Sequence, residues 1–522
     1  MQPSLGGLLL SFLHLIALCS ASNAGLMVTT STGSFTGMLN PRYNNVREFR
    51  SVPYAKPPVG ERRWLPPANL SRSSKHSTSI RFPPSCPQYV SGIHSVWSDI
   101  VPQYFINDGN FNTTAGLQAQ SSAEDCLKLA IWTPANATSN SSLPVLMFMT
   151  GGGFSTGGID IDYQVPPSWV SRTQSHIVVT INYRVNIMGF PNAAGLDDQN
   201  LGILDQRMAL EWLHANVKSF GGNPNAITLW GQSAGSMSTS YHSYAYYGNP
   251  IAAGYFMQSG TALKPLGTPD VTHTNFTFVA KNLGCDFPED ADAELDCMRQ
   301  VPINMIINFW GQYSDSGKTP ALRFAPIADE RIIFSNYTAR AEAGLVAKVP
   351  AISSNAANEA ASLSTYPANN VTAGPYQVAV DAATLSDWIC DSANNSALRK
   401  AGGLTTYRYQ HASNFSNISP LDWLGAYHSS DLPFNFGTYG IVRGNGTAFE
   451  REVSETMQNY IYAFITDPEN GPRQLGWVPF DPDAADGGTM LRFGADGLAV
   501  QNVTGNEVDG PCFGIGTYDS SP

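Results

Sequence analysis

Residues 229–235, Leu-Trp-Gly-Gln-Ser-Ala-Gly, constrain the fold more than any other stretch of this chain. The Gly-x-Ser-x-Gly pattern follows a short apolar run at residues 226–230 and precedes a proline-free segment, residues 234–247, that can form a helix. A serine in a sharp turn between strand and helix is exposed above the sheet edge, beside free N–H groups at the helix N-terminus. Glycine is needed on both sides because a side chain would clash in so tight a turn. The pattern predicts that Ser233 is a nucleophile.

The same pattern occurs a second time at residues 153–157, with Ser155 at its centre. This copy also follows an apolar run, residues 145–149. However, residues 157–162 (Gly-Gly-Ile-Asp-Ile-Asp) are a poor start for a helix, so the second copy lacks one half of the expected context. Ser155 therefore remains the rival candidate, and Ser233 the favoured one.

Charge and the N-terminus restrict the class of protein. The 522 residues include 29 Lys and Arg against 41 Asp and Glu, a formal net charge of −12, and no basic stripe for nucleic acid. The long apolar segment at residues 5–18 is too short to span a bilayer comfortably and is followed by small residues up to Ala24. We expect residues 1–24 to be a secretory signal peptide and the mature protein to be extracellular.

Two further features fit secretion. Seven cysteines minus Cys19 in the signal peptide leave six, an even number suited to an oxidising compartment. Potential N-glycosylation sequons are also frequent, although chance alone produces several, so many are expected to stay unmodified. The twelve asparagines concerned are Asn69, Asn112, Asn136, Asn140, Asn275, Asn336, Asn370, Asn394, Asn414, Asn417, Asn445 and Asn502.

Strand and helix patterns alternate along the chain. Strands are expected at residues 124–132, 143–150, 177–185, 349–352 and 405–410, and helices at residues 168–175, 205–218 and 454–465. This alternation is typical of the α/β class, with a mainly parallel central sheet and helices on both faces. Because the chain shows no internal repeat, linker or long charge run, we expect one domain over residues 25–522.

A serine nucleophile needs a base and an acid that orients the base. On a sheet of this kind the chain order is serine, acid, histidine. Because the acid must lie between Ser233 and the histidine in the chain, the late histidines His411 and His428 are favoured as the base. His411 ends a strand candidate, and His428 lies in a loop without apolar periodicity. His428 is preferred because catalytic groups commonly lie in loops. Glu359 is the candidate acid because it lies just beyond an expected strand end.

With these residues in place, the chain resembles the type-B carboxylesterases, the lipase and cholinesterase branch of the α/β-hydrolase fold, and most of all their secreted fungal members. The resemblance is dense up to about Gly260 and sparse after it. Its blocks are residues 49–67, 124–127, 150–154, 182–184, 220–224, 231–235, 257–260, 326–329, 358–359 and 428–431, with Gly202, Asp205 and Gln206.

The resemblance implies an α/β-hydrolase fold and a set of roles. Ser233, Glu359 and His428 would form the triad, and Ser259 and Asp431 would support the acid and the base from behind. The remaining implied residues are the oxyanion-hole N–H groups of Gly152, Gly153 and Ala234 and the disulfides Cys86–Cys126, Cys285–Cys297 and Cys390–Cys512. No metal or organic cofactor is expected.

The chain also departs from the family pattern. Gln232 replaces the glutamate that commonly precedes the nucleophile, which removes a buried negative charge beside the site. Ser353 and Ala360 stand where glycines usually bracket the acid's motif, and Thr150 stands where an aromatic residue or histidine often precedes the glycine run. The Cys86–Cys126 loop lacks a tryptophan in the context that binds choline. Because a cholinesterase needs a cation site, Gln232 and the missing tryptophan argue against a cholinesterase.

The expected function is a secreted serine hydrolase of hydrophobic carboxylic esters. The rivals are an interfacial triacylglycerol lipase or sterol esterase of the same family, and a non-catalytic adhesion protein on the same fold. Helical spacing within the Cys86–Cys126 loop predicts an amphipathic helix that acts as a lid, or else only as a fixed wall. The residues concerned are Val90, Ile93, Trp97, Ile100, Val101 and Tyr104. A mobile lid would predict a preference for substrates with medium or long acyl chains and a transient contact of the enzyme with a lipid interface. The oligomeric state stays open.

Overall fold

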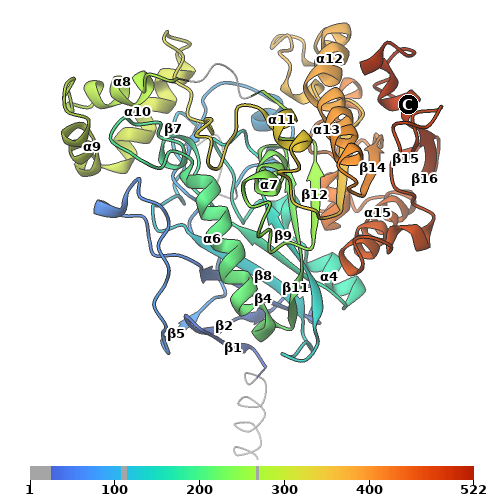
Figure 1. The fold of residues 1–522 in the computed structure, drawn as a ribbon, viewed down its shortest axis with the longest axis horizontal. Coiled ribbons are helices and arrows are strands. Elements are labelled where there is room, and N and C mark those ends of the chain that lie inside the picture. The colour runs from blue at the N-terminus through green and yellow to red at the C-terminus, as the bar shows by residue number, and fades with distance from the viewer. Residues whose placement is uncertain (1–24, 107–114, 266–269) are drawn as a thin grey trace, which may run out of the picture.

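A sheet of eleven strands forms the centre of the computed structural model, which describes residues 25–106, 115–265 and 270–522 (Figure 1). The expected signal peptide with Cys19, and the sequon at Asn112, lie outside the described residues. The strands, in spatial order, are β16 (Leu498–Thr504), β15 (Thr489–Ala495), β14 (Thr406–His411), β13 (Ala351–Ala356), β12 (Gly254–Gln258), β11 (Gly222–Gln232), β9 (Leu143–Met149), β10 (Ile177–Ile181), β8 (Lys128–Pro134), β4 (Val46–Pro53) and β3 (Met38–Leu39).

The centre of this sheet is parallel and its edges are antiparallel. Every neighbouring pair from β10 to β15 is parallel. The pairs β10–β8, β8–β4, β4–β3 and β15–β16 are antiparallel. The predicted α/β-hydrolase class, with a mainly parallel sheet, is therefore confirmed. Parallel strands place their carboxyl ends on one edge, which is where ligands bind in such sheets.

Side chains of the central strands alternate between two cores. In β9, Val145, Met147 and Met149 are fully buried in one core, and Leu146 and Phe148 are fully buried in the other. A strand that is apolar on both sides requires cover on both faces of the sheet.

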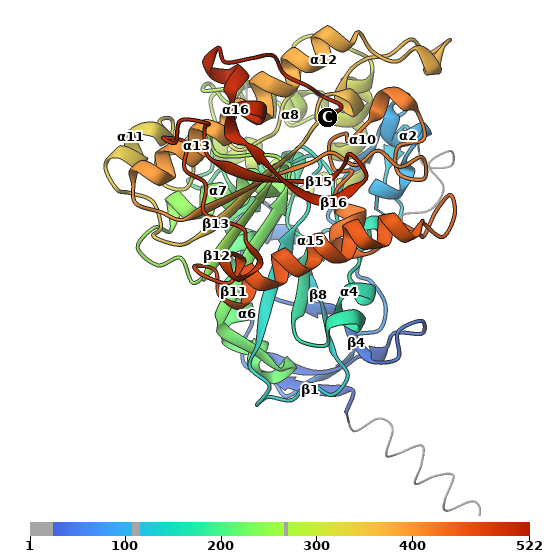
Figure 2. The same ribbon diagram turned by 90° about the vertical axis from the view of Figure 1, so that its right-hand side faces the viewer.

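Helices supply that cover (Figures 1 and 2). Helices α6 (Leu201–Asn216) and α7 (Ala234–Ala245) contribute Leu210 and Tyr241 to the first core. Helices α4 (Pro167–Thr173) and α15 (Ala448–Thr466) contribute Trp169 and Met457 to the second. The predicted placement of helices on both faces is thus observed.

Three further helices pack together at one end of the molecule: α8 (Thr274–Asn282), α9 (Ala291–Gln300) and α10 (Ile303–Asp315) (Figure 1). The structure contains three disulfides, in the pairs that the resemblance implied. They join Cys86 to Cys126, Cys285 to Cys297 between α8 and α9, and Cys390 to Cys512 near the C-terminus.

Candidate active site

Ser233 lies in the turn between β11 and α7, at the carboxyl edge of the sheet. Its backbone angles, φ 58° and ψ −123°, are strained for a residue with a side chain. A Cβ on Gly231 would lie 2.0 Å from the Gly235 carbonyl oxygen, and one on Gly235 would lie 2.0 Å from the Met149 carbonyl oxygen. The two flanking glycines therefore allow the end of β11, the start of α7 and the end of β9 to approach one another closely. The turn exposes Ser233 in a cavity.

The glycine run after β9 forms the adjacent wall of that cavity. Gly152 and Gly153 have φ of 106° and 60°, the left-handed region that glycine adopts without strain. Within the described residues, the backbone N–H groups of Gly152, Gly153 and Ala234 have no hydrogen-bond acceptor. All three residues line the cavity beside Ser233. Free donors at such a place suit a negatively charged oxygen.

Glu359 and His428 meet next to the turn. A backbone bridge between Asn358 and Tyr427 brings their two segments side by side. His428 Nδ1 then lies 2.5 Å from Glu359 Oε2, and the second carboxylate oxygen accepts a hydrogen bond from the Ala356 N–H at 2.8 Å. Glu359 is fully buried. The carboxylate therefore fixes the orientation of the imidazole ring and places a proton on Nδ1.

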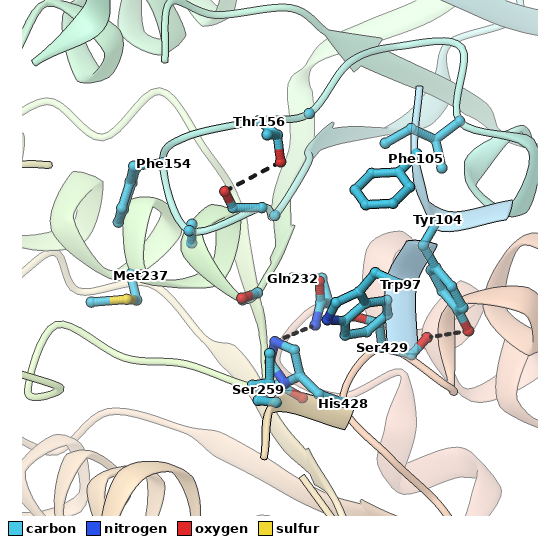
Figure 3. Close-up of a pocket in the computed structure, with 18 of the residues that line it drawn as sticks. Trp97, Tyr104, Phe105, Phe154, Thr156, Gln232, Met237, Ser259, His428 and Ser429 are labelled. Atoms are coloured by element: carbon cyan, nitrogen blue, oxygen red, sulfur yellow. Dashed lines mark hydrogen bonds between the residues drawn. The ribbon is translucent and has the colours of Figure 1, made fainter. Parts of the chain in front are cut away.

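The other nitrogen of His428 contacts a residue that the sequence marked as unusual. Gln232 Nε2 lies 3.2 Å from His428 Nε2 (Figure 3). The Ser233 hydroxyl makes no hydrogen bond to another described residue, although Ser233 and His428 line the same cavity.

Ser259 and Asp431 lie behind these groups. Ser259 directly follows β12, has a φ of 60° and lines the cavity. Asp431 is fully buried, and this burial, reinforced by the charge of Glu359, raises the pKa of Asp431 to about 7. By contrast His411, the other late histidine, is fully buried, and burial lowers its pKa to about 3. His411 hydrogen-bonds Ser413 and does not line the cavity.

The cavity has a volume of about 450 Å³, and aromatic residues form part of its lining. Aromatic side chains come from Trp97, Tyr104, Phe105, Phe154 and Trp388. Several of them surround the groups described above in Figure 3. Such a lining favours an apolar or aromatic substrate group.

Residues 90–104, within the Cys86–Cys126 loop, do not form the single helix that their apolar spacing predicted. This stretch instead contains a short strand β6 (Tyr89–Val90), one helical turn α2 (Val96–Asp99) and a 3₁₀ turn η2 (Pro102–Tyr104). Ser95 caps α2, and Pro102 cannot continue an α-helix, so the helical stretch is interrupted at both ends. Trp97 and Tyr104 still line the cavity, whereas Ile93 is 54% exposed.

Sequence reasoning missed three residues of the cavity wall. The Trp388 ring packs against His428 with ring centroids 5.6 Å apart, and the Lys264 ammonium lies 3.9 Å from the centroid of the Trp388 ring. Arg323 is the second cationic residue of the wall. No motif surrounds any of these residues, and only the fold brings them to the nucleophile. Among the described residues, no cluster of three or more His, Cys, Asp or Glu could hold a metal ion.

Comparison with known proteins agrees with this geometry. A model of the carboxylesterase family matches residues 24–401. The chain is 40% identical to a chlorogenic acid esterase of Aspergillus niger over 503 residues, 94% of each chain. It is 36% identical to secreted lipase 5 of Gibberella zeae over 527 residues, again 94% of each chain. The chain belongs to the carboxylesterase family and is a carboxylic ester hydrolase, as its resemblance predicted.

Proposed function

We propose that this protein hydrolyses esters with apolar or aromatic acyl groups through an acyl-enzyme on Ser233. The observation that supports this best is the strained turn, which presents Ser233 to a cavity that also contains His428, itself held by Glu359. A serine, a base and an acid that orients the base are the parts that nucleophilic ester hydrolysis needs.

In the first step His428 Nε2 takes the Ser233 proton while the serine oxygen attacks the ester carbonyl. The carbonyl oxygen becomes an oxyanion, which the N–H groups of Gly152, Gly153 and Ala234 would stabilise. Removing one such donor typically costs about 3–4 kcal/mol of transition-state stabilisation. His428 then gives the proton to the leaving alcohol, and water repeats the attack on the acyl-enzyme to release the acid.

Ser259 and Asp431 would support this pair from behind. Because the pKa of Asp431 is raised to about 7, its carboxyl is largely protonated below neutral pH and adds little negative charge beside Glu359. We propose that it keeps Glu359 and His428 in place, without touching the substrate.

The aromatic cavity suggests the substrate class. The Aspergillus niger relative is named for an aromatic ester, and Trp97, Tyr104 and Trp388 would pack against an aromatic acyl group of that kind. Initial rates on p-nitrophenyl esters from acetate to palmitate, beside an aromatic acyl ester, test this directly. Faster turnover of palmitate than of every aromatic and short ester would contradict it.

An interfacial lipase is the second candidate, because the Gibberella zeae relative is named a secreted lipase. For this candidate the Cys86–Cys126 segment must open. However, Asp315 of α10 accepts hydrogen bonds from Tyr89, Ser91 and Gly92 at 2.7–2.9 Å, which ties the segment to a helix. We propose that residues 86–106, in the described part of this segment, are a fixed wall. Rates on tributyrin below and above its solubility limit decide: a smooth curve supports the wall, and an abrupt rise supports the lid.

We further propose secretion, with residues 1–24 removed and residues 25–522 forming one mature domain. The three disulfides and the relatives named as secreted support this. No helix within the described ranges is long and apolar enough to cross a membrane.

Two sequons are expected to stay unmodified in the folded protein. Asn275 and Asn417 are only 9% and 8% exposed, and their amide nitrogens donate to the carbonyl oxygens of Arg323 and Tyr439. Mass spectrometry of the secreted protein, with and without deglycosylation, identifies the modified asparagines. A glycan on either buried asparagine would contradict this assignment.

A further inference from the structure

The side chains that line the active-site cavity include cations but no carboxylate, since Glu359 lies buried behind His428 and Asp387 lies outside the lining. Apart from His428, the charged residues among those that line it are Lys264 and Arg323, and no aspartate or glutamate is among them. This is unexpected, because the whole chain carries 41 acidic residues against 29 Lys and Arg. A cationic wall in an acidic protein raises the local concentration of anions over that of neutral molecules.

Lys264 and Arg323 also line a second cavity, of about 460 Å³, so they form the junction between the two. Lys264 is already engaged: its ammonium lies over the Trp388 ring, 3.4 Å from an Asp387 carboxylate oxygen. Arg323 is exposed, and no hydrogen bond or ion pair among the described residues involves its guanidinium. Residues 266–269, outside those ranges, contain no charged side chain.

The second cavity is more polar than the first. Asparagine side chains of Asn192, Asn275 and Asn336 line it. Asp270 is its acidic residue, but both carboxylate oxygens of Asp270 accept hydrogen bonds from the first turn of α8, at 2.7–3.0 Å. Asp270 is therefore committed to capping a helix, and Arg323 remains the available charge at the junction.

We propose that this enzyme prefers esters whose alcohol half carries a free carboxylate. The apolar acyl half occupies the aromatic cavity beside Ser233, and the alcohol half extends into the second cavity, where Arg323 binds its carboxylate. A planar guanidinium matches a carboxylate with two parallel N–H donors. This proposal rests on the proposed function and adds the chemical class of the alcohol half of the substrate.

The test follows the release of caffeate from two substrates: caffeoylquinate, with a free carboxylate, and its quinate methyl ester, which is neutral. Wild type should show the higher kcat/KM on the anion. In Arg323→Gln the anion-to-neutral ratio should fall about tenfold, mainly through KM. Arg331→Gln, an exposed arginine paired with Asp198 and outside both cavities, should keep the wild-type ratio.

The outcomes separate this proposal from the proposed function. An unchanged ratio in Arg323→Gln, or a wild-type preference for the methyl ester, overturns carboxylate recognition while leaving ester hydrolysis intact. A monoester of a dicarboxylic acid places the charge on the acyl half, and a preference for that probe over caffeoylquinate overturns the assigned direction. No hydrolysis of any ester contradicts the proposed function itself.

The contact between Gln232 and His428 supports a second inference, which does not depend on the first. Since Glu359 accepts the proton of Nδ1, Nε2 of His428 has a lone pair, and the Gln232 amide N–H donates to it. Both side chains are buried, with exposed fractions of 2% and 4%. A donor in this place can only pair with the neutral ring, because an imidazolium has no lone pair to accept with.

We infer that Gln232 is a positioning residue: its N–H holds the neutral His428 ring in the resting enzyme and gives way to the Ser233 hydroxyl, which then donates to the same lone pair. A carboxylate here would instead pair with the protonated ring and favour it. Three other groups face His428: Glu359 on Nδ1, the buried Asp431, and the Trp388 ring. The Lys264 ammonium lies over that Trp388 ring. They are the same in every variant, so a change at position 232 isolates its effect.

The measurement is kcat/KM for p-nitrophenyl acetate from about pH 4 to 9. In Gln232→Glu the acidic limb of the kcat/KM profile should move up by about one pH unit. Gln232→Met loses the hydrogen-bond donor without adding a charge, so its acidic limb should move up by less. Gln164→Glu places a carboxylate in the same cavity without a hydrogen bond to His428 and should shift the limb least. An acidic limb that stays at its wild-type position in both folded Gln232 variants overturns the inference, whatever happens to kcat.

Discussion

The Gly-x-Ser-x-Gly pattern occurs twice in this chain and adopts two different structures. At residues 231–235, β11 ends at Gln232, Ser233 has positive φ, and α7 begins at Ala234. At residues 153–157 the strand has already ended at Met149, and the N–H groups of Ser155 and Thr156 fold back onto the Gly152 carbonyl at 2.9 and 3.1 Å. A helix follows the first copy, and a closed turn forms the second.

From this difference we infer that the helix, more than the five residues of the pattern, would make Ser233 a nucleophile. An N-terminal helix turn leaves N–H groups free and forces the serine outward. In the second copy Phe154, not the serine, has the positive φ, and Ser155 Oγ contacts the Gly153 carbonyl. The second copy instead contributes the free N–H group of Gly153 to the same cavity.

Exchanging the two serines for alanine should give the largest contrast. In Ser233→Ala we expect kcat/KM to fall by about 10⁵-fold, because no other group can form the acyl-enzyme. In Ser155→Ala it should stay within about threefold, because that hydroxyl does not line the cavity. Steady-state rates on p-nitrophenyl butyrate measure both. The opposite pattern would exchange the roles of the two copies.

The acid that orients the base should have the next largest effect. Glu359→Gln keeps the shape but removes the charge that holds the Nδ1 proton, so kcat should fall by about 10³- to 10⁴-fold. Glu452→Gln, on the exposed surface of α15, is the matched control and should keep wild-type kcat. Near-normal kcat in Glu359→Gln would mean that another carboxylate serves His428.

Removal of the Cys86–Cys126 disulfide, beside the second copy, should have the next largest effect. Gln88, just inside the Cys86–Cys126 loop, exchanges two hydrogen bonds with Gly157, at 2.9 and 3.0 Å, and so clamps that turn. Replacing both cysteines by alanine should cost about 4 kcal/mol of unfolding free energy and also lower kcat/KM.

Removing the Cys285–Cys297 bridge, which closes a shorter loop and does not line the active-site cavity, should cost about 3 kcal/mol and leave kcat/KM unchanged. Urea unfolding and steady-state rates on the two double variants give both quantities. Equal losses of kcat/KM would show that the second copy needs no clamp.

Glycine substitutions should give the smallest contrast. In Gly235→Ala the added Cβ would meet the Met149 carbonyl oxygen at 2.0 Å, so we expect a loss of about 3 kcal/mol. At Gly153 a Cβ would meet no atom within 4 Å, so only the positive φ of 60° opposes Gly153→Ala, at about 1–2 kcal/mol. Urea midpoints rank the two variants. A less stable Gly153→Ala would contradict the tight crossing at the first copy.

Local pattern predicted the sheet and its central turn well. Strands such as β9 and β10 are continuous apolar runs, which follow directly from burial on both faces. The start of α15 was expected at Ser454 but lies at Ala448, because Thr447 and Glu450 form a capping box about two turns earlier.

The cavity wall was harder to predict, for a physical reason. The spacing from Val90 to Tyr104 suggested a helix, yet the tertiary contacts of Tyr89 and Ser91 with Asp315, together with Pro102, impose a strand and two short turns. Lys264 and Arg323 belong to segments without periodicity. Their meeting depends on the packing of distant elements, which leaves no local signal.

Covalent trapping tests the central claim most directly. A p-nitrophenyl alkylphosphonate reacts with an activated serine and stops at a stable adduct, because water cannot complete the second step. We predict that inactivation is complete at one adduct per chain, that peptide mass spectrometry finds it on Ser233, and that Ser233→Ala takes up none. An adduct on Ser155, or stoichiometric labelling of folded Ser233→Ala, would contradict the account.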